Sequence, residues 1–187
     1  MTRPGRMLFF LRNHLAGAPL ILALFTSMGE WEHDAAVWSA ALTVTTSGVA
    51  LRAWSSCHCN YAGRKPALLA VTGPYSLVRN PLYLGNILLI VGATIASELL
   101  WLAPVSALWA FAVYATAVAV YEEPMMHRRY GEAWERYAAA VPAWVPALRL
   151  PAMDAPSFLA SLAPQSLRLL WLVPFLLKEL KWFGLGH

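Results

Sequence analysis

The sequence predicts an all-α, polytopic membrane protein with four transmembrane helices, and a fifth if the carboxyl-terminal tail crosses the bilayer. Hydrophobic residues make up 59% of the 187 residues and charged residues only 13%, against roughly 25% charged in a soluble domain. Nine tryptophans and seven tyrosines suit aromatic belts at two water–lipid interfaces. The net charge of +4 gathers at the ends of apolar segments, so membrane topology explains it better than nucleic-acid binding.

Four apolar segments support this fold, over residues 15–31, 35–51, 81–97 and 99–121. The fourth has no charged residue and is long enough to span a bilayer, which takes about 20 residues. The first three are near the lower limit, and we expect them to extend into their polar flanks. Arg3, Arg6 and Arg12 precede the first segment as in a signal peptide, but no small-x-small cleavage site follows, so a retained helix is expected.

The other segments are predicted to be polar or interfacial. We expect a linker over 55–66 and a cytoplasmic amphipathic helix over 122–141. The tail is predicted to form an interfacial or re-entrant helix; the alternative, a fifth span over 155–177, would bury Arg168 near mid-membrane. Cys57, His58 and Cys59 could form half a metal site, but no second Cys/His cluster accompanies them, so no metal is expected.

Charge asymmetry predicts the orientation. The amino-terminal arginines, the linker and the basic run after the fourth segment fall on one side of a four-helix path, which the positive-inside rule places in the cytoplasm. We expect a multi-pass protein of the plasma or inner membrane if the source is bacterial. The chain reads as one domain over 1–187, with the first two helices in 1–54, a core in 55–146 and a tail in 147–187. No oligomeric state is predicted.

The polar block from Gly73 to Gly85 enters the hairpin of the third and fourth segments. Gly73-Pro74 is a helix-start signal, and Tyr75, Arg79 and Tyr83 then follow at the spacing of one helical face. Pro81 is expected to interrupt that helix and to free a backbone carbonyl. Arg79 suits a carboxylate, Asn80 can donate and accept, and Gly85 permits close approach. The simpler interpretation is an ordinary helix start with an interfacial arginine.

A pair of carboxylates, Glu122 and Glu123, leaves the hairpin on the same side. Adjacent helical residues point about 100° apart, so only one is expected to face a given pocket. Alternatively, both are solvated at a helix amino terminus. Charges this close to lipid are functional by default. Together the two blocks predict a pocket at the membrane surface for a polar, cationic ligand.

The two blocks resemble those of the membrane methyltransferases related to isoprenylcysteine carboxyl methyltransferase and phospholipid N-methyltransferases. That family's first block is Gly-x-Tyr-x-x-x-Arg-His-Pro-x-Tyr-x-Gly, matched here by Gly73, Tyr75, Arg79, Asn80, Pro81, Tyr83 and Gly85. Its second block is matched by Glu122, Glu123, Met126, Tyr130, Gly131, Trp134, Tyr137 and Pro142. The resemblance covers about residues 67–146.

The resemblance implies an S-adenosylmethionine-dependent methyltransferase with a cytoplasmic cofactor site and a lipophilic acceptor that enters from the bilayer. Glu122 and Arg79 are the predicted catalytic residues. The predicted cofactor contacts are Tyr75, Arg79, Asn80, Pro81, Leu82, Tyr83, Gly85, Glu122, Glu123, Ala67 and Ala70. Tyrosine rings can stabilise a sulfonium by cation–π attraction, and methyl transfer depends mostly on positioning and desolvation.

Four positions depart from the family pattern. Asn80 replaces the usual histidine, Ala67 and Val118 replace a histidine and an arginine of the prenylcysteine enzymes, and Ala143 replaces a common basic residue. Prenylcysteine is therefore not the expected acceptor. Two other functions are open: an NADPH-dependent membrane reductase of the sterol-reductase type, and a non-catalytic membrane binding protein.

Overall fold

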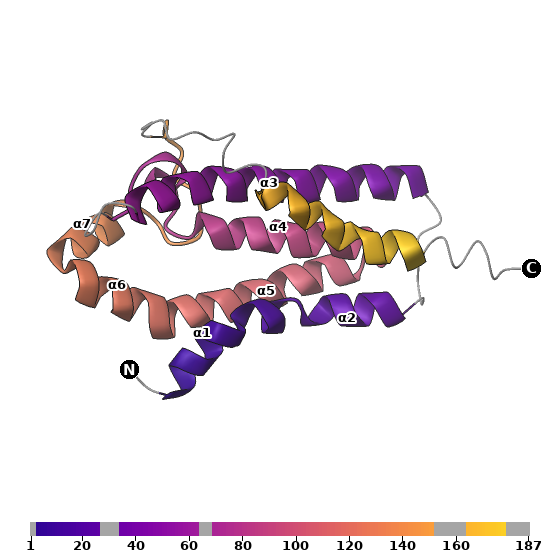
Figure 1. The fold of residues 1–187 in the computed structure, drawn as a ribbon, viewed down its shortest axis with the longest axis horizontal. Helices are drawn as coiled ribbons and strands as arrows, with labels where there is room; N and C mark the ends of the chain where they lie inside the picture. Colours follow the sequence, from indigo (N-terminus) through magenta and orange to yellow (C-terminus); the bar gives the residue numbers. More distant parts are fainter. Residues whose placement is uncertain (1–2, 27–33, 64–68, 152–163, 179–187) are drawn as a thin grey trace, which may run out of the picture.

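The computed structural model describes residues 3–26, 34–63, 69–151 and 164–178, and within these ranges all regular structure is helical. The elements, in order, are α1 (Arg3–Ala16), α2 (Ala18–Phe25), α3 (Asp34–Gly63), η1 (Gly73–Ser76), α4 (Pro81–Ile95), α5 (Leu102–Ala117), η2 (Val118–Glu122), α6 (Glu123–Tyr130), α7 (Glu132–Ala140) and η3 (Leu167–Leu172). The long helices lie side by side in an elongated bundle (Figure 1). The predicted all-α class is confirmed.

Two helices of the described chain are long and apolar enough to cross a membrane, fewer than the four predicted. They are Gly5–Phe25 and Leu102–Tyr130. Helix α4 has 15 residues, fewer than the roughly 20 that span a bilayer. Helix α3 has 30 residues but carries Arg52 and many hydroxyl side chains, so it is less apolar than α4 and α5. The proposed fifth span, 155–177, falls partly outside the described residues.

Proline divides the amino-terminal helix. Pro19 cannot donate to the carbonyl four residues earlier, that of Leu15, and Trp109 of α5 donates its Nε1–H to this oxygen at 2.7 Å. The break between α1 and α2 therefore lies against a neighbouring helix that satisfies the freed carbonyl, which a bilayer requires.

Helices α3 and α4 lie side by side and approach closely. A Cβ built on Gly92 would lie 2.2 Å from Oγ1 of Thr45, and one on Gly48 would lie 3.0 Å from the carbonyl oxygen of Gly85. Small residues allow such contacts between membrane helices. Helix α3 continues to Gly63, so most of the predicted 55–66 linker is helical, and residues 64–68 lie outside the description.

The tail packs along the bundle. Residues 164–178 are helical and cross α3 and α4, in yellow in Figure 1. Leu172 and Phe175 are buried in one cluster with Ala23, Ala41 and Ala93. The tail therefore contributes to the core of the bundle over this stretch, although it was predicted to be interfacial or re-entrant.

One end of the bundle gathers the polar elements. The amino-terminal end of α1, the carboxyl-terminal end of α3, η1, α6 and α7 lie at this end, while α2 ends and α5 begins at the other (Figure 1). The two sequence blocks are therefore brought to the same end, as a hairpin between them requires.

Candidate functional site

The first block folds as a short 3-10 turn followed by a new helix. Gly73–Ser76 forms η1, and Pro81 occupies the first turn of α4, where its missing N–H costs nothing. The prediction that Pro81 interrupts a helix and that Tyr75, Arg79 and Tyr83 share one helical face was wrong. Tyr75 lies in η1, Tyr83 lies in α4 and Arg79 lies in the segment between them, so one helix does not position all three side chains.

The segment after α7 holds this block in place. The N–H of Arg79 donates to the carbonyl of Pro142 at 2.9 Å, and the N–H of Ala147 donates to that of Leu77 at 2.9 Å. Nδ2 of Asn80 donates to the carbonyl of Ala143 at 3.1 Å. The backbone of an irregular segment is thus satisfied by protein, as membrane depth demands. Asn80 serves this connection through the same amide that was predicted to contact a cofactor.

The second block begins in a wide turn of the long apolar helix. Val118–Glu122 is a single π turn between α5 and α6, closed by a bond from the N–H of Glu123 to the carbonyl of Val118. Pro124 follows immediately and has no N–H to donate, which breaks the regular ladder at this point. π turns of this kind are frequent at functional sites. Here the turn sets the direction of both glutamates.

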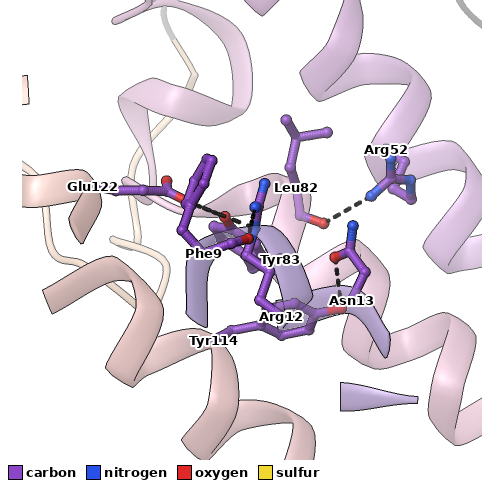
Figure 2. Close-up of polar contacts among 8 residues, drawn as sticks. All are labelled: Phe9, Arg12, Asn13, Arg52, Leu82, Tyr83, Tyr114 and Glu122. Carbon is purple, nitrogen blue, oxygen red and sulfur yellow. Dashed lines mark hydrogen bonds and ion pairs between the residues drawn. The ribbon is translucent and has the colours of Figure 1, made fainter. Parts of the chain in front are cut away.

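Glu122 joins three elements. Its Oε1 accepts a hydrogen bond from the hydroxyl of Tyr83 in α4 and lies 3.8 Å from Nε of Arg12 in α1. Figure 2 shows these side chains converging, with the ring of Phe9 beside them, and the Arg12 guanidinium lies 3.7 Å from that ring's centroid. Sequence reasoning missed Arg12 as a site residue. The signal was an arginine between the apolar turn of residues 7–11 and the first apolar segment, where a charge so close to lipid is costly.

Glu123 pairs with Arg79. Nη1 of Arg79 lies 2.9 Å from Oε1 of Glu123, and its guanidinium lies 5.7 Å from the centre of the Trp134 ring. Nε of Arg79 is buried and has no hydrogen-bond partner among the described residues. A buried donor without a partner is unfavourable, so this atom is available to a ligand.

These residues surround a pocket of about 180 Å³. The lining residues are Cys59, Leu69, Ala70, Tyr75, Arg79, Asn80, Leu82, Val118, Glu122, Glu123, Met126, Trp134 and Tyr137. Both glutamates line it, so the prediction that only one could do so was wrong. The pocket extends along the helix from Val118 to Met126 and around it, and it is wide enough to meet two adjacent side chains.

The predicted cofactor residues divide into three groups. Tyr75, Arg79, Asn80, Leu82, Ala70, Glu122 and Glu123 line the pocket, while Pro81, Tyr83 and Gly85 do not. Tyr83 is connected to it through Glu122. Gly85 faces α3, since a Cβ there would lie 2.5 Å from Cγ of Arg52. Ala67 lies outside the described residues.

An aromatic wall closes the pocket on the side of α7. The hydroxyl of Tyr137 donates to the backbone carbonyl of Tyr75 at 2.8 Å, and the ring of Trp134 lies 5.7 Å from that of Tyr137. Burial raises the pKa of both Tyr75 and Tyr137 well above the ordinary value, so both are neutral phenols at physiological pH. The wall therefore presents uncharged aromatic rings to the pocket.

A sharp elbow separates α6 from α7. Gly131 has φ 51°, a region that favours glycine, and so the helix predicted over 122–141 is two helices. Trp134 and Tyr137 of α7, with Val141 directly after it, form one buried face that packs against Leu69 and Met126. The elbow turns this face toward the pocket, which Met126, Trp134 and Tyr137 line.

The Cys57-His58-Cys59 triplet lies at the end of α3 beside η1. Nδ1 of His58 lies 2.9 Å from Oγ1 of Thr72, Cys57 is buried, and Cys59 is exposed and lines the pocket. Within the described ranges, no group of three or more His, Cys, Asp or Glu side chains could hold a metal ion. His58 has a packing role, because it fills the space beside Gly73.

Comparisons with known proteins identify the family. The model of the phospholipid methyltransferase family matches residues 34–133. The chain is 36% identical over 160 residues to the nickel-cobalt-cadmium resistance protein NccN of Alcaligenes xylosoxydans xylosoxydans, covering 80% of this chain and 73% of the relative. It is 34% identical over 153 residues to the cobalt-zinc-cadmium resistance protein CzcN of Cupriavidus metallidurans, covering 75% and 68%. No solved structure is significantly similar. The chain belongs to the phospholipid methyltransferase family, as the two sequence blocks predicted.

Proposed function

We propose that this protein transfers a methyl group from S-adenosylmethionine to a lipophilic acceptor in the membrane. The observation that carries the proposal is the pocket that Arg79, Glu122 and Glu123 share with an aromatic wall, in a chain of a methyltransferase family. The family and the two long apolar helices indicate membrane association, which fits an acceptor that is itself lipophilic.

The chemistry of the lining suits S-adenosylmethionine. The cofactor has a carboxylate, an amine, ribose hydroxyls and a sulfonium cation. Arg79 has an unused buried Nε–H for the carboxylate, and arginine binds carboxylates through such forked donors. Glu122 would hold the amine or a ribose hydroxyl. The Tyr75 and Trp134 rings would face the sulfonium, because cations are attracted to ring faces.

When bound, the cofactor supplies an electrophilic methyl group. The residues of this chain would bind, orient and exclude water, which is the main requirement for methyl transfer. Tyr83 and Arg12 hold Oε1 of Glu122 in place, so this carboxylate is fixed before any ligand arrives. If the acceptor is an amine or a thiol, the Glu122 carboxylate is the group that would take its proton.

The orientation in the membrane belongs to the same proposal. The pocket end of the bundle has the beginning of α1 and helix α6, and the long apolar helices run away from it (Figure 1). Basic residues are part of both, with Arg6 in α1 and Arg128 and Arg129 in α6. The positive-inside rule then places the pocket in the cytoplasm, with several helices spanning or embedded in the bilayer. The acceptor would approach from the side, through the lipid.

The names of two relatives add a cellular context. Both are called metal resistance proteins, and the described residues of this chain offer no cluster suited to a metal ion. We therefore infer that metal resistance would depend on the methylated product and not on metal binding by this chain. Methylation of a membrane component would alter tolerance to cations such as nickel, cobalt or cadmium.

Transfer of a radioactive methyl group tests the proposal. Membranes containing the protein are incubated with S-adenosylmethionine labelled on its methyl group, and the lipid extract is counted. Glu122→Gln should reduce incorporation at least tenfold, while Glu132→Gln, which removes an exposed glutamate of α7, should leave it unchanged. The proposal is wrong if these membranes incorporate no more label than membranes without the protein. If the protein also binds NADPH, it is a reductase and not a methyltransferase.

A further inference from the structure

Two arginines of the bundle are held side by side, and neither is paired with a carboxylate of the described residues. Arg52 of α3 and Arg168 of η3 both donate their Nε–H to Oε1 of Gln165, at 3.1 and 2.9 Å. In the part of the chain that the structure describes, the ion pairs are those of Arg12, Arg79 and His127. Neither Arg52 nor Arg168 is among them, so two positive charges share one neutral oxygen.

Arg52 is deeply placed. Its residue is only 9% exposed, and its remaining contacts are to the carbonyl oxygen of Leu82, at 3.3 Å, and to Oδ1 of Asn86. All its partners are therefore neutral oxygens. A buried charge that lacks a counter-charge is strongly unfavourable, and an ionisable group inside a membrane protein is a functional candidate by default.

The fold makes specific room for this side chain. Gly85 of α4 lies against it, since a Cβ there would meet Cγ of Arg52 at 2.5 Å. The tail contributes the second arginine and the glutamine, so the cluster joins α3, α4 and η3. A residue that only snorkelled to water would need no such space or partners.

The arginine pair lies directly beside the candidate cofactor pocket. Leu82, whose carbonyl Arg52 contacts, lines that pocket, and Figure 2 shows Arg52 reaching Leu82 from the side opposite Glu122. Arg52 also shares a face of α3 with Cys59, another lining residue, two helical turns and roughly 10 Å further along. A molecule could therefore touch both regions at once.

We propose that Arg52 and Arg168 bind an anionic oxygen group, a carboxylate or a phosphate, of the lipophilic acceptor. This inference rests on the proposed function and deepens it: the acceptor is an anionic amphiphile whose charged group is held beside the pocket. Both guanidinium groups already meet at an oxygen, Oε1 of Gln165, and an anionic oxygen group beside it would suit them better, because carboxylates and phosphates accept paired N–H donors. Gln165 would keep the two arginines aligned.

Lipid binding to the purified full chain, in detergent and without cofactor, tests this directly. The probes are radiolabelled oleate for a lipid carboxylate, lysophosphatidic acid for a lipid phosphate, and a neutral monoacylglycerol, with inorganic phosphate and acetate as free anions. We expect saturable binding of one of the anionic lipids at one per chain. Arg52→Gln and Arg168→Gln should each weaken it at least tenfold, and Arg52→Lys should weaken it less than Arg52→Gln.

Matched measurements separate this site from a structural role. Arg128→Gln removes an exposed arginine of α6 and should bind lipid as the parent does. A purely structural Arg52 would lower the melting temperature of Arg52→Gln while lipid affinity stayed unchanged, and that result would overturn the inference. If Arg52→Gln does not fold, the lipid affinity of Arg168→Gln, which changes a less buried residue, tests the inference instead.

Two further outcomes would also overturn it. Equal binding of the neutral monoacylglycerol would show that charge is not recognised, and saturation by inorganic phosphate or acetate alone would show a site for free anions. Binding of S-adenosylmethionine is measured on the same samples. If cofactor binds but anionic lipid affinity is independent of both arginines, this inference fails while the proposed function stands.

Discussion

At the scale of single residues, the candidate site is organised by two ion pairs that sit on either side of one helix. Glu122 reaches back to Tyr83 and Arg12, while Glu123 reaches Arg79. The two neighbouring carboxylates are thus anchored by different elements, α1 with α4 in one case and the loop before α4 in the other. The contribution that we propose for each of them to ligand binding can therefore be tested separately.

The Tyr83 hydroxyl is expected to support cofactor affinity through Glu122. Tyr83→Phe removes the donor and leaves the carboxylate with Arg12 only, a loss of about 1 kcal/mol, or roughly fivefold in affinity. Titration calorimetry with S-adenosylmethionine measures it. Tyr121→Phe is the control, since its ring stacks on Phe9. Equal affinities for the two variants would show that the Glu122–Tyr83 contact has no part in binding.

The Tyr137 hydroxyl is expected to affect stability and its pH dependence. Tyr137→Phe loses the hydrogen bond to the Tyr75 carbonyl and should cost about 1 kcal/mol near neutral pH. Burial raises the pKa of Tyr137, so the folded state favours the neutral phenol. Its stabilisation is complete below the unfolded pKa of about 10 and is lost as the pH rises above it.

Melting temperatures in detergent from pH 8 to 11 measure this dependence. The parent should lose stability above about pH 10, and Tyr137→Phe should lose less over the same interval, because one buried phenol is gone. A parent and variant that decline in parallel would show that Tyr137 titrates as an exposed phenol.

At the scale of elements, sequence patterns predicted the helices and the meeting of the two blocks, but not their breaks. The helical hairpin and the aromatic face of α7 follow from periodicity. The elbow at Gly131 depends on its φ of 51°, which periodicity does not reveal. The segment before α4 depends on tertiary contacts, such as the bond from Ala147 to Leu77. Arg12 could not be assigned to the site because its partner is more than a hundred residues away in sequence.

Two glycines with positive φ should differ in their tolerance of alanine. Gly131→Ala meets nothing within 4 Å, so only its φ of 51° is penalised, at about 1–3 kcal/mol. Gly73→Ala adds a clash, because its Cβ would lie 2.3 Å from Nε2 of His58. Thermal unfolding should therefore show the larger loss for Gly73→Ala. In a His58→Ala background, the difference in thermal stability between Gly73→Ala and Gly131→Ala should become smaller. An unchanged difference would show that His58 does not clash with the added methyl group.

At the scale of the whole molecule, one end of the bundle contains the pocket, and at the opposite end α2 and α4 finish while α3 and α5 begin (Figure 1). Core clusters of small, aliphatic and aromatic side chains connect the two ends. The anchored tail adds Leu172 and Phe175 to this core. The chain therefore presents its polar site on one side of an apolar body, the arrangement expected of an enzyme that takes substrate from a membrane.

Labelling of single cysteines tests this orientation. In a Cys57→Ser/Cys59→Ser background, Trp101→Cys places a thiol at an exposed position beside the start of α5, and Arg128→Cys places one at the pocket end. A membrane-impermeant maleimide should label the Trp101→Cys variant in intact cells and the Arg128→Cys variant only after lysis. The reverse pattern would put the pocket outside the cell, where S-adenosylmethionine is scarce.

The most direct test of the central claim is calorimetric titration of S-adenosylmethionine into the detergent-purified protein, beside Glu122→Gln and Glu132→Gln. The account predicts saturable binding at one cofactor per chain that Glu122→Gln weakens at least tenfold and Glu132→Gln leaves unchanged. A folded parent protein that shows no binding, or equal binding by all three proteins, would contradict the assignment of this pocket to S-adenosylmethionine.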